Sequence, residues 1–289
     1  MITLKAHAKI NLTLDVTGFT DNGYHSLSMI MQSVALADLL TIDAISEGIL
    51  FSSGSTRIPV NENNLVFKAA RLFLDAMSLP HNVHIDLKKR IPVSAGLAGG
   101  SADAAAVLTG LNEFFGCGLS LEELKALGVQ LGADVPFCLT GGTALCEGVG
   151  EIITKLPDMP DCYILIAKPL RGMSTPKAFA LFDEYEGPLP VINNAAAIQA
   201  LHNKDLDTLC LHAANKLQPI TESCVGTVKY LAEKFAENGA KAASMTGSGT
   251  AVFGVFDSRM TAEKCRRRLH RAVLSYITTP SDRGVTIIR

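Results

Sequence analysis

The sequence lacks the cysteine spacing of a metal site and the long hydrophobic runs of a membrane protein. Its seven cysteines are odd in number and form neither a C-x-x-C pair nor a Cys/His zinc pattern. No run approaches the ~18 apolar residues needed to span a bilayer, and the first residues alternate apolar and polar instead of forming the apolar centre of a signal peptide. We therefore expect a cytoplasmic protein with no membrane partner and no metal-ligand cluster of its own.

An excess of charge of one sign is also lacking. The chain has 26 Lys and Arg against 28 Asp and Glu, a net charge of −2, so no overall positive field favours binding to nucleic acid. The one basic run lies on a helical pattern near the C-terminus and comprises Lys264, Arg266, Arg267, Arg268 and Arg271. Because aromatic residues do not alternate with these cations, the run is more typical of a solvated helix face than of a nucleic-acid site.

The hydrophobic content is sufficient for about two domains. With 289 residues, 48% of them hydrophobic, the chain can bury a large core without disulfides. Apolar residues stand at every second position from Ile2 to Val16, which predicts a long half-buried strand with Lys9 and Asn11 together on its opposite face. We also expect strands at 38–45 and 83–87, helices at 65–77 and 101–115, and a helix opening with the capping box at 120–123.

The proline-rich stretch at 156–160 is typical of a linker, and we predict a division into domains 1–155 and 156–289. The second domain is expected to contain a strand at 162–168, a helix capped by Thr175, helices at 206–217 and 222–237, a hairpin at 242–256 around Gly247-Ser248-Gly249 and a strand at 285–288. This order of elements favours a mixed α+β architecture with two sheets, each layered by helices.

The strongest chemical signal is a run of small residues between a strand and a helix. It consists of Pro92, Val93, Ser94, Ala95, Gly96, Leu97, Ala98, Gly99, Gly100, Ser101 and Ala102. Small residues let the backbone approach an anion closely, and the helix start expected at Ser101 offers unpaired N–H groups and the positive end of the helix dipole. A flexible connection is the alternative, but phosphate binding explains the run better. The run matches neither the Walker pattern nor the dinucleotide G-x-G-x-x-G pattern.

This run resembles the second motif of the GHMP kinases, a superfamily that includes galactokinase, homoserine kinase and mevalonate kinase. Three further segments resemble that family in order and spacing: A-K-I-N-L at 8–12, L-G-A-D-V-P-F at 131–137 and M-T-G-S-G-T-A-V-F at 245–253. The resemblance implies the two-domain GHMP kinase fold of the α+β class, with an N-terminal ribosomal-protein-like α/β domain and a C-terminal ferredoxin-like α+β domain. It also implies that residues 92–102 bind the phosphates of ATP with Mg²⁺, and that Lys9 and Asp134 are catalytic.

Within the superfamily, A-K-I-N-L followed by D-N-G-Y-H-S-L at 21–27 resembles the kinases that act on 4-diphosphocytidyl-2-C-methyl-D-erythritol, a CDP ester of the non-mevalonate isoprenoid pathway. The likeness covers nearly the whole chain and implies phosphorylation of the 2-hydroxyl of that substrate. The residues it implies as substrate contacts are Asn11, Tyr24, His25, Thr175 and Phe179. A GHMP kinase for mevalonate, homoserine or a sugar is the first alternative, and a non-catalytic binding module is the second. We expect a monomer or a homodimer.

Two departures from the family pattern limit what the resemblance implies. Ala102 stands where the family often has a second serine, so no hydroxyl contact to magnesium or phosphate is expected there. The stretch N-K-L-Q at 215–218 stands where N-D-L-E is common, so it offers no acidic group.

Taken singly, the proposed site residues have simpler interpretations. Lys9 would be a strand lysine facing water, Asp134 a turn residue and Phe179 a core residue of a helix. Only the joint pattern favours catalysis. In a phosphoryl transfer Asp134 would orient the acceptor hydroxyl and take its proton, while Lys9 would stabilise charge near the transferring phosphate.

Overall fold

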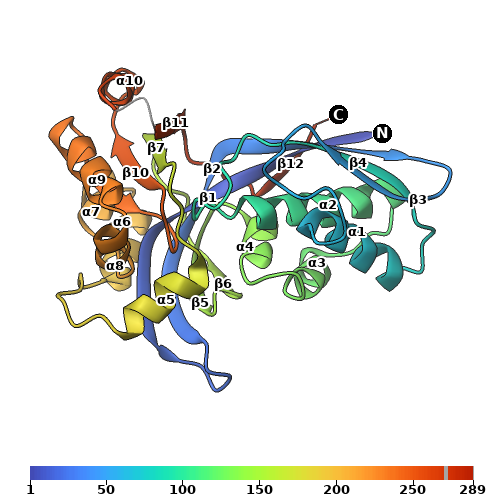
Figure 1. Ribbon diagram of the computed structural model, residues 1–289, viewed down its shortest axis with the longest axis horizontal. Helices are drawn as coiled ribbons and strands as arrows, with labels where there is room; N and C mark the ends of the chain where they lie inside the picture. Colours follow the sequence, from blue (N-terminus) through green and yellow to red (C-terminus); the bar gives the residue numbers. More distant parts are fainter. Residues whose placement is uncertain (270–272, 289) are drawn as a thin grey trace.

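A computed structural model describes residues 1–269 and 273–288 of the chain, and within them the strands form two sheets (Figure 1). The larger sheet has the order β12 (Val285–Ile288), β1 (Ile2–Phe19), β2 (His25–Ala44), β4 (Asn82–Lys88) and β3 (Gly48–Ser53), with β5 (Thr143–Gly148), β6 (Ile152–Lys155) and β8 (Ala214–Asn215) joining at β2, β5 and β1. The smaller sheet has the order β11 (Val273–Thr278), β7 (Tyr163–Pro169), β10 (Val252–Phe256) and β9 (Ala242–Met245).

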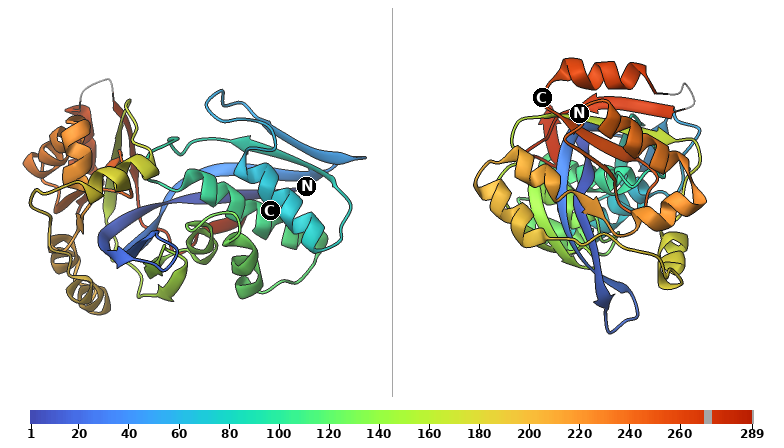
Figure 2. Two further views of the ribbon diagram at one scale, coloured as in Figure 1. Left: turned by 60° about the horizontal axis from the view of Figure 1, so that its bottom comes forward. Right: turned by 90° about the vertical axis from the view of Figure 1, so that its left-hand side faces the viewer.

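Helices layer both sheets (Figures 1 and 2). Those beside the larger sheet are α1 (Leu65–Ala76), α2 (Gly99–Phe115), α3 (Leu121–Gly128) and α4 (Val135–Thr140), and those of the other half are α5 (Thr175–Asp183), α6 (Asn194–His202), α7 (Leu206–Leu211), α8 (Gln218–Cys224), α9 (Thr227–Glu237) and α10 (Arg259–Arg267). The central helix α2 packs directly on β1 and β2. Its small residues allow this close approach: a Cβ at Gly110 would lie 2.6 Å from Ile42 Cδ1. The α+β class and the expected layering are confirmed.

The long β1–β2 hairpin joins the two halves of the molecule (Figure 1). It is antiparallel, and its register shifts between His7 and Lys9 and again between Asn11 and Thr13. Such bulges re-aim side chains, and these two lie on either side of the Lys9–Asn11 pair. The expectation of a half-buried strand is wrong, because Lys9 and Asn11 are as buried as the apolar residues behind them. The second face of β1 is covered by other parts of the chain.

Both ends of the chain contribute to the larger sheet. β12 pairs antiparallel with β1, matching Ala6 with Val285, and the short β8 pairs parallel with β1. The termini accordingly lie close together in Figure 1. The division at residue 155 remains a proposal. The larger sheet contains strands from both sides of that residue.

Several predicted elements have other bounds in the structure. The helix expected at 206–217 is wrong: α7 ends at Leu211, and residues 214–215 instead pair with β1. The helix expected at 222–237 is two helices, since α8 ends at Cys224 and α9 begins at Thr227. Helix α2 begins at Gly99 rather than Ser101, and β2 begins at His25 rather than Asp38. The hairpin of β9 and β10 and the final strand are confirmed.

The basic run forms the end of α10, where cations complement the helix dipole. Arg266 pairs with Glu263 one turn earlier, as expected for a solvated helix face, while Arg271 lies outside the described residues. Among the helices of residues 1–269 and 273–288, none is long and apolar enough to cross a membrane.

Candidate active site

A cleft of about 660 Å³ lies where the small-residue run meets β1, α4, α5 and the β9–β10 turn. Most residues predicted for the site line it, from four separate segments of the chain. They are Lys9, Asn11, the run from Pro92 to Ser101, Asp134, Thr175 and Phe179, and the turn Gly247–Gly249 lines the cleft as well. Tyr24, His25 and Ala102 do not line it. Residues separated by more than 200 positions are thus brought to one cavity.

The small-residue run, here called the phosphate loop (residues 92–101), ends at the start of α2. Ser94 and Ala98 both have φ of 53°, a left-handed conformation that turns the chain sharply. The first backbone hydrogen bond of the helix runs from Ala102 N–H to the Ala98 carbonyl, 2.8 Å away. The N–H groups of the three residues before Ala102 precede that bond, so they are free by helix geometry to hold an anion. Ala102 itself is fully buried, which explains why it does not line the cleft.

Backbone contacts hold the phosphate loop from two sides. Lys9 N–H donates to the Leu97 carbonyl at 3.2 Å, and Ala251 N–H donates to the Ala95 carbonyl at 3.1 Å. Gly96 has φ of +77°, and a Cβ there would lie 2.1 Å from the Thr246 carbonyl oxygen. This glycine is therefore required by the close approach of the β9–β10 turn to the loop. The two glycine-containing motifs face each other across that contact.

A residue without a side chain is needed at position 99 for a different reason from the one expected. The sequence suggests that small residues leave room for an approaching phosphate. A Cβ at Gly99 would instead point into the protein, 3.0 Å from Ile91 Cγ2 and 3.1 Å from Lys89 Nζ. Gly99 therefore allows α2 to begin against the segment that precedes the loop.

Both residues of the proposed catalytic pair line the cleft. Lys9 Nζ is 4.0 Å from Asp134 Oδ2 and donates a hydrogen bond of 2.7 Å to Asn11 Oδ1. The Lys9 side chain is 5% exposed and that of Asp134 is 34% exposed, so the carboxylate is the accessible partner. Asp134 is the N-cap residue of α4, followed by Pro136 in the first turn. A carboxylate beside a buried ammonium group can orient a hydroxyl and accept its proton.

Asn11 connects the pair to the β9–β10 turn. Its backbone N–H donates to Thr246 Oγ1 at 3.0 Å, and that hydroxyl lies 3.1 Å from Asn11 Oδ1 and 3.2 Å from the Gly96 carbonyl oxygen. The side chain of Asn11 thus orients Lys9 and is itself oriented by Thr246. Sequence reasoning missed Thr246, although it lies within the M-T-G-S-G segment that indicated this turn.

The other side of the cleft is formed by α5. Thr175 Oγ1 lies 2.9 Å from Ser248 Oγ, which links α5 to the same turn. The prediction that Thr175 caps the helix is wrong: Ser174 is the N-cap residue and Thr175 the first helical residue. Phe179, one turn further, lines the cleft.

The two residues predicted from the hairpin lie outside the cleft lining. His25 stacks on Phe179 with ring centroids 4.5 Å apart, and its Nε2 is 2.7 Å from Asp183 Oδ1. It therefore contacts the cleft-lining Phe179 without lining the cleft itself. Tyr24 is 69% exposed at the tip of the β1–β2 hairpin, which projects from the body of the molecule in Figure 2.

Three further residues that line the cleft were not predicted as site residues. Asn64 caps α1 by accepting from Val66 N–H at 2.9 Å, and it lines the cleft together with Lys89 and Asp103. The sequence indicated Asn64 only as a helix cap. Nothing in the spacing of Lys89 and Asp103 along the chain indicated that they meet, since an ion pair between separate elements has no local pattern.

Comparison with known proteins agrees with this fold and cleft. The family model described as the GHMP kinases N-terminal domain matches residues 64–142, and the GHMP kinases C-terminal model matches residues 197–275. These matches include the phosphate loop, Asp134 and the turn at 247–249. The chain belongs to the GHMP kinases, a family of ATP-dependent small-molecule kinases.

More particularly, the chain is similar to kinases of one CDP ester. It is 43% identical over 268 residues to the 4-diphosphocytidyl-2-C-methyl-D-erythritol kinase of Lachnoclostridium phytofermentans, with 91% of each chain covered. It is 40% identical over 266 residues to the protein of that name from Clostridium tetani, covering 92% of this chain and 95% of that one.

Solved structures also match the fold of this chain. The crystal structure of a 4-(cytidine 5'-diphospho)-2C-methyl-D-erythritol kinase matches with a TM-score of 0.83 and 31% identity, covering 96% of this chain and 99% of that chain. The homoserine kinase of Cytophaga hutchinsonii matches with a TM-score of 0.78 at 19% identity, covering 99% of this chain and 97% of that one, which supports the fold alone.

Proposed function

We propose that the protein transfers the γ-phosphoryl group of ATP to the 2-hydroxyl of 4-diphosphocytidyl-2-C-methyl-D-erythritol, a step in making isoprenoid precursors. The observation that carries this proposal is the single cleft that joins the phosphate loop, the Lys9–Asp134 pair and Phe179. The relatives of Lachnoclostridium phytofermentans and Clostridium tetani that carry this name each match more than nine tenths of the chain. We further propose that the enzyme works in the cytoplasm as a monomer or a homodimer, without nucleic acid.

The geometry assigns a distinct role to each part of the cleft. The free N–H groups at the start of α2 hold phosphate oxygens of ATP. The Asp134 carboxylate orients the acceptor hydroxyl and takes its proton as the oxygen attacks the γ-phosphorus, and the bond to the β-phosphate oxygen breaks. Lys9 stabilises the negative charge of the transferring group from its buried position, where a fixed charge acts more strongly than in water.

The cleft accommodates a magnesium ion only with help from the nucleotide. No group of three or more His, Cys, Asp or Glu able to hold a metal ion occurs within residues 1–269 and 273–288. Mg²⁺ prefers oxygen ligands and keeps several waters. We therefore propose that phosphate oxygens and water hold the ion, with Asp134 as the one accessible carboxylate beside Lys9. When bound, the ion would neutralise phosphate charge.

The acceptor side distinguishes this substrate from smaller ones. A CDP ester carries a pyrimidine far from the reacting hydroxyl, and an aromatic face is the natural partner of such a ring. Phe179 offers that face within the cleft, and Thr175 and Asn11 offer polar groups. Mevalonate and homoserine have no ring to occupy this position.

Substrate identity is tested by measuring ATP consumption with a panel of acceptors. The panel contains the CDP ester, mevalonate, homoserine and galactose at equal concentrations. We expect kcat/KM for the CDP ester to exceed that for each other acceptor by at least ~100-fold, about 2.7 kcal/mol of transition-state binding. Comparable turnover of homoserine or mevalonate would contradict the proposal and favour another GHMP kinase activity. A variant with Asp134→Asn serves as the background control.

A further inference from the structure

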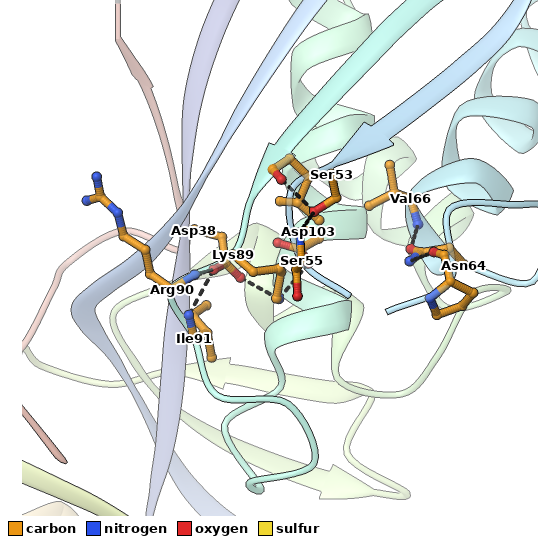
Figure 3. Close-up of polar contacts among 11 residues, drawn as sticks. Asp38, Ser53, Ser55, Asn64, Val66, Lys89, Arg90, Ile91 and Asp103 are labelled. Atoms are coloured by element: carbon orange, nitrogen blue, oxygen red, sulfur yellow. Dashed lines mark hydrogen bonds and ion pairs between the residues drawn. The ribbon is translucent and has the colours of Figure 1, made fainter. Parts of the chain in front are cut away.

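A buried network of three charged residues lies beside the two ends of the phosphate loop (Figure 3). Lys89 Nζ donates to Asp38 Oδ2 at 2.5 Å and to Asp103 Oδ2 at 2.8 Å. The exposed fractions of these side chains are 7% for Lys89, 0% for Asp38 and 4% for Asp103. Burying three charges is costly unless they compensate one another, so the network needs an explanation beyond ordinary surface pairing.

The network is attached to both ends of the phosphate loop. Asp38, on β2, accepts through Oδ1 from the backbone N–H groups of Arg90 and Ile91, the two residues immediately before Pro92. Asp103 lies on α2, four residues beyond the helix start at Gly99. Figure 3 shows Lys89 between the two carboxylates, while the Arg90 side chain points away from them. One ammonium group therefore ties the segment before the loop to the helix after it.

The contact at Gly99 provides separate support. A Cβ at this position would lie 3.1 Å from Lys89 Nζ, closer than almost all real Cβ contacts. The first residue of α2 therefore lies directly against the ammonium group of the network. Any movement of Lys89 would act on the helix start whose N–H groups face the cleft.

Within the network, the carboxyl group of Asp103 is unusual in its hydrogen bonding and in its pKa. Its Oδ1 is buried without a hydrogen-bond partner in the described part of the chain, and the residue lines the cleft. Burial raises the pKa of Asp103 well above its ordinary value, against the opposing effect of Lys89. Burial by itself would lower the pKa of Lys89, but Asp103 and Asp38 outweigh it and the pKa of this lysine is raised. Asp103 therefore brings a buried carboxylate oxygen without a partner in the described residues to the lining of the cleft.

We propose that Asp38, Lys89 and Asp103 are positioning residues for the phosphoryl donor: the network holds the phosphate loop and the start of α2 in the arrangement that binds ATP. None of the three takes part in the chemical step. The proposal rests on the proposed function only in that ATP binds in this cleft. It requires that loss of the network weakens the binding of ATP more than it weakens the binding of the acceptor substrate.

The first test uses Asp103→Ala and Asp103→Asn, with a non-hydrolysable ATP analogue titrated by calorimetry. Asp103→Ala removes the tie to Lys89, and we expect its Kd for the analogue to rise at least ~10-fold. Asp103→Asn keeps an oxygen that can accept from Lys89, so its Kd should stay within about threefold of the wild type. An unchanged Kd in Asp103→Ala, or equal loss in both variants, would overturn the proposal.

A triple variant separates positioning from stability. Lys89→Met with Asp103→Leu replaces the pair by apolar groups of similar size, and Asp38→Asn in the same chain avoids leaving an uncompensated buried charge. The side-chain oxygen at position 38 can still accept from the two backbone donors of residues 90 and 91 in this variant. We expect the Tm to return to within a few degrees of the wild type while the Kd for the analogue remains at least ~10-fold raised. Recovery of ATP affinity with the apolar pair would show that packing alone suffices, and would overturn the proposal.

Lys241→Met is a matched control. Lys241 also lies between two aspartates, Asp207 and Asp257, and none of these three residues lines the cleft. Its Kd for the analogue should stay within twofold of the wild type, and a larger change would count against a specific role for the Lys89 network.

Binding of the CDP ester is measured in parallel for every variant. Failure of the wild type to bind it would contradict the proposed function while leaving the ATP measurements valid. Equal weakening of both ligands in Asp103→Ala would indicate general disruption and would overturn the positioning role.

Discussion

The two sides of the cleft are built differently. On the donor side the phosphate loop is held by backbone bonds to β1 and to Ala251, just before β10, and by the buried network of Lys89. On the acceptor side, Phe179 is partly buried and stacks on His25, and the nearby hairpin tip is exposed. A triphosphate is bound by many fixed dipoles, which must be oriented in advance. A base and a sugar-like chain can be bound by fewer, more adaptable contacts.

The largest effect on turnover is expected at Asp134, where the two sides of the cleft meet. Asp134→Asn keeps the shape of the side chain but removes its ability to accept the proton of the acceptor hydroxyl. We expect kcat to fall by ~10²-fold or more, with the affinity for ATP within about twofold of the wild type. Steady-state kinetics and calorimetry with an ATP analogue measure the two quantities. Near-normal turnover would remove Asp134 from the proposed chemistry.

Rigidity of the donor side is tested at Gly96. In Gly96→Ala the new Cβ would lie 2.1 Å from the Thr246 carbonyl oxygen, and φ of +77° adds backbone strain. We expect the affinity for ATP to fall at least ~10-fold, and the free energy of unfolding to fall by roughly 1–3 kcal/mol more than backbone strain alone would cause.

Gly23→Ala is the control for that prediction. Gly23 has φ of +79° in the hairpin turn, yet no atom lies within 4 Å of a Cβ placed there. This variant should show only the strain of a left-handed alanine, about 1 kcal/mol, with unchanged affinity for ATP. If both variants lose the same stability and both bind ATP normally, the loop does not depend on its contact with the turn.

The same contrast explains what could be predicted from the sequence. The phosphate loop is one continuous run, and its function follows from residue size and a helix start, so local reasoning found it. The position of Phe179 depends on α5 packing beside a hairpin more than 150 residues away, which no spacing encodes. Lys89 and Asp103 were missed for the same reason, and the helix expected at 206–217 failed because pairing of residues 214–215 with β1 outweighed local helix preference.

A moderate effect is expected from Phe179, the aromatic residue that lines the acceptor side. Stacking on a base contributes about 1–3 kcal/mol, and one face of the Phe179 ring is already stacked on His25. Phe179→Ala should therefore raise KM for the CDP ester roughly 5- to 10-fold and leave KM for ATP nearly unchanged. Phe182→Ala is the matched control, since that ring meets His25 edge-on and does not line the cleft. Equal changes in both variants would show that helix packing, not base contact, is responsible.

The smallest effect is expected at Tyr24, and it decides whether the acceptor side closes over its ligand. The ring is 69% exposed at the hairpin tip, outside the cleft lining. The turn itself is held by backbone bonds, with Thr20 N–H donating to the Tyr24 carbonyl at 2.7 Å, so Tyr24→Ala should preserve it. Because the tip would have to bend for the ring to reach a bound base, part of the stacking energy of about 1–3 kcal/mol is spent on that movement.

We therefore expect Tyr24→Ala to raise KM for the CDP ester by no more than about fivefold, without change in KM for ATP. Phe19→Ala provides a comparison, since Phe19 is similarly exposed beside His25 near the same hairpin end. A rise of tenfold or more for Tyr24→Ala alone would mean that the hairpin tip closes on the cytosine ring. The acceptor side would then become as ordered as the donor side once its ligand is bound, and the contrast between them would belong to the free enzyme only.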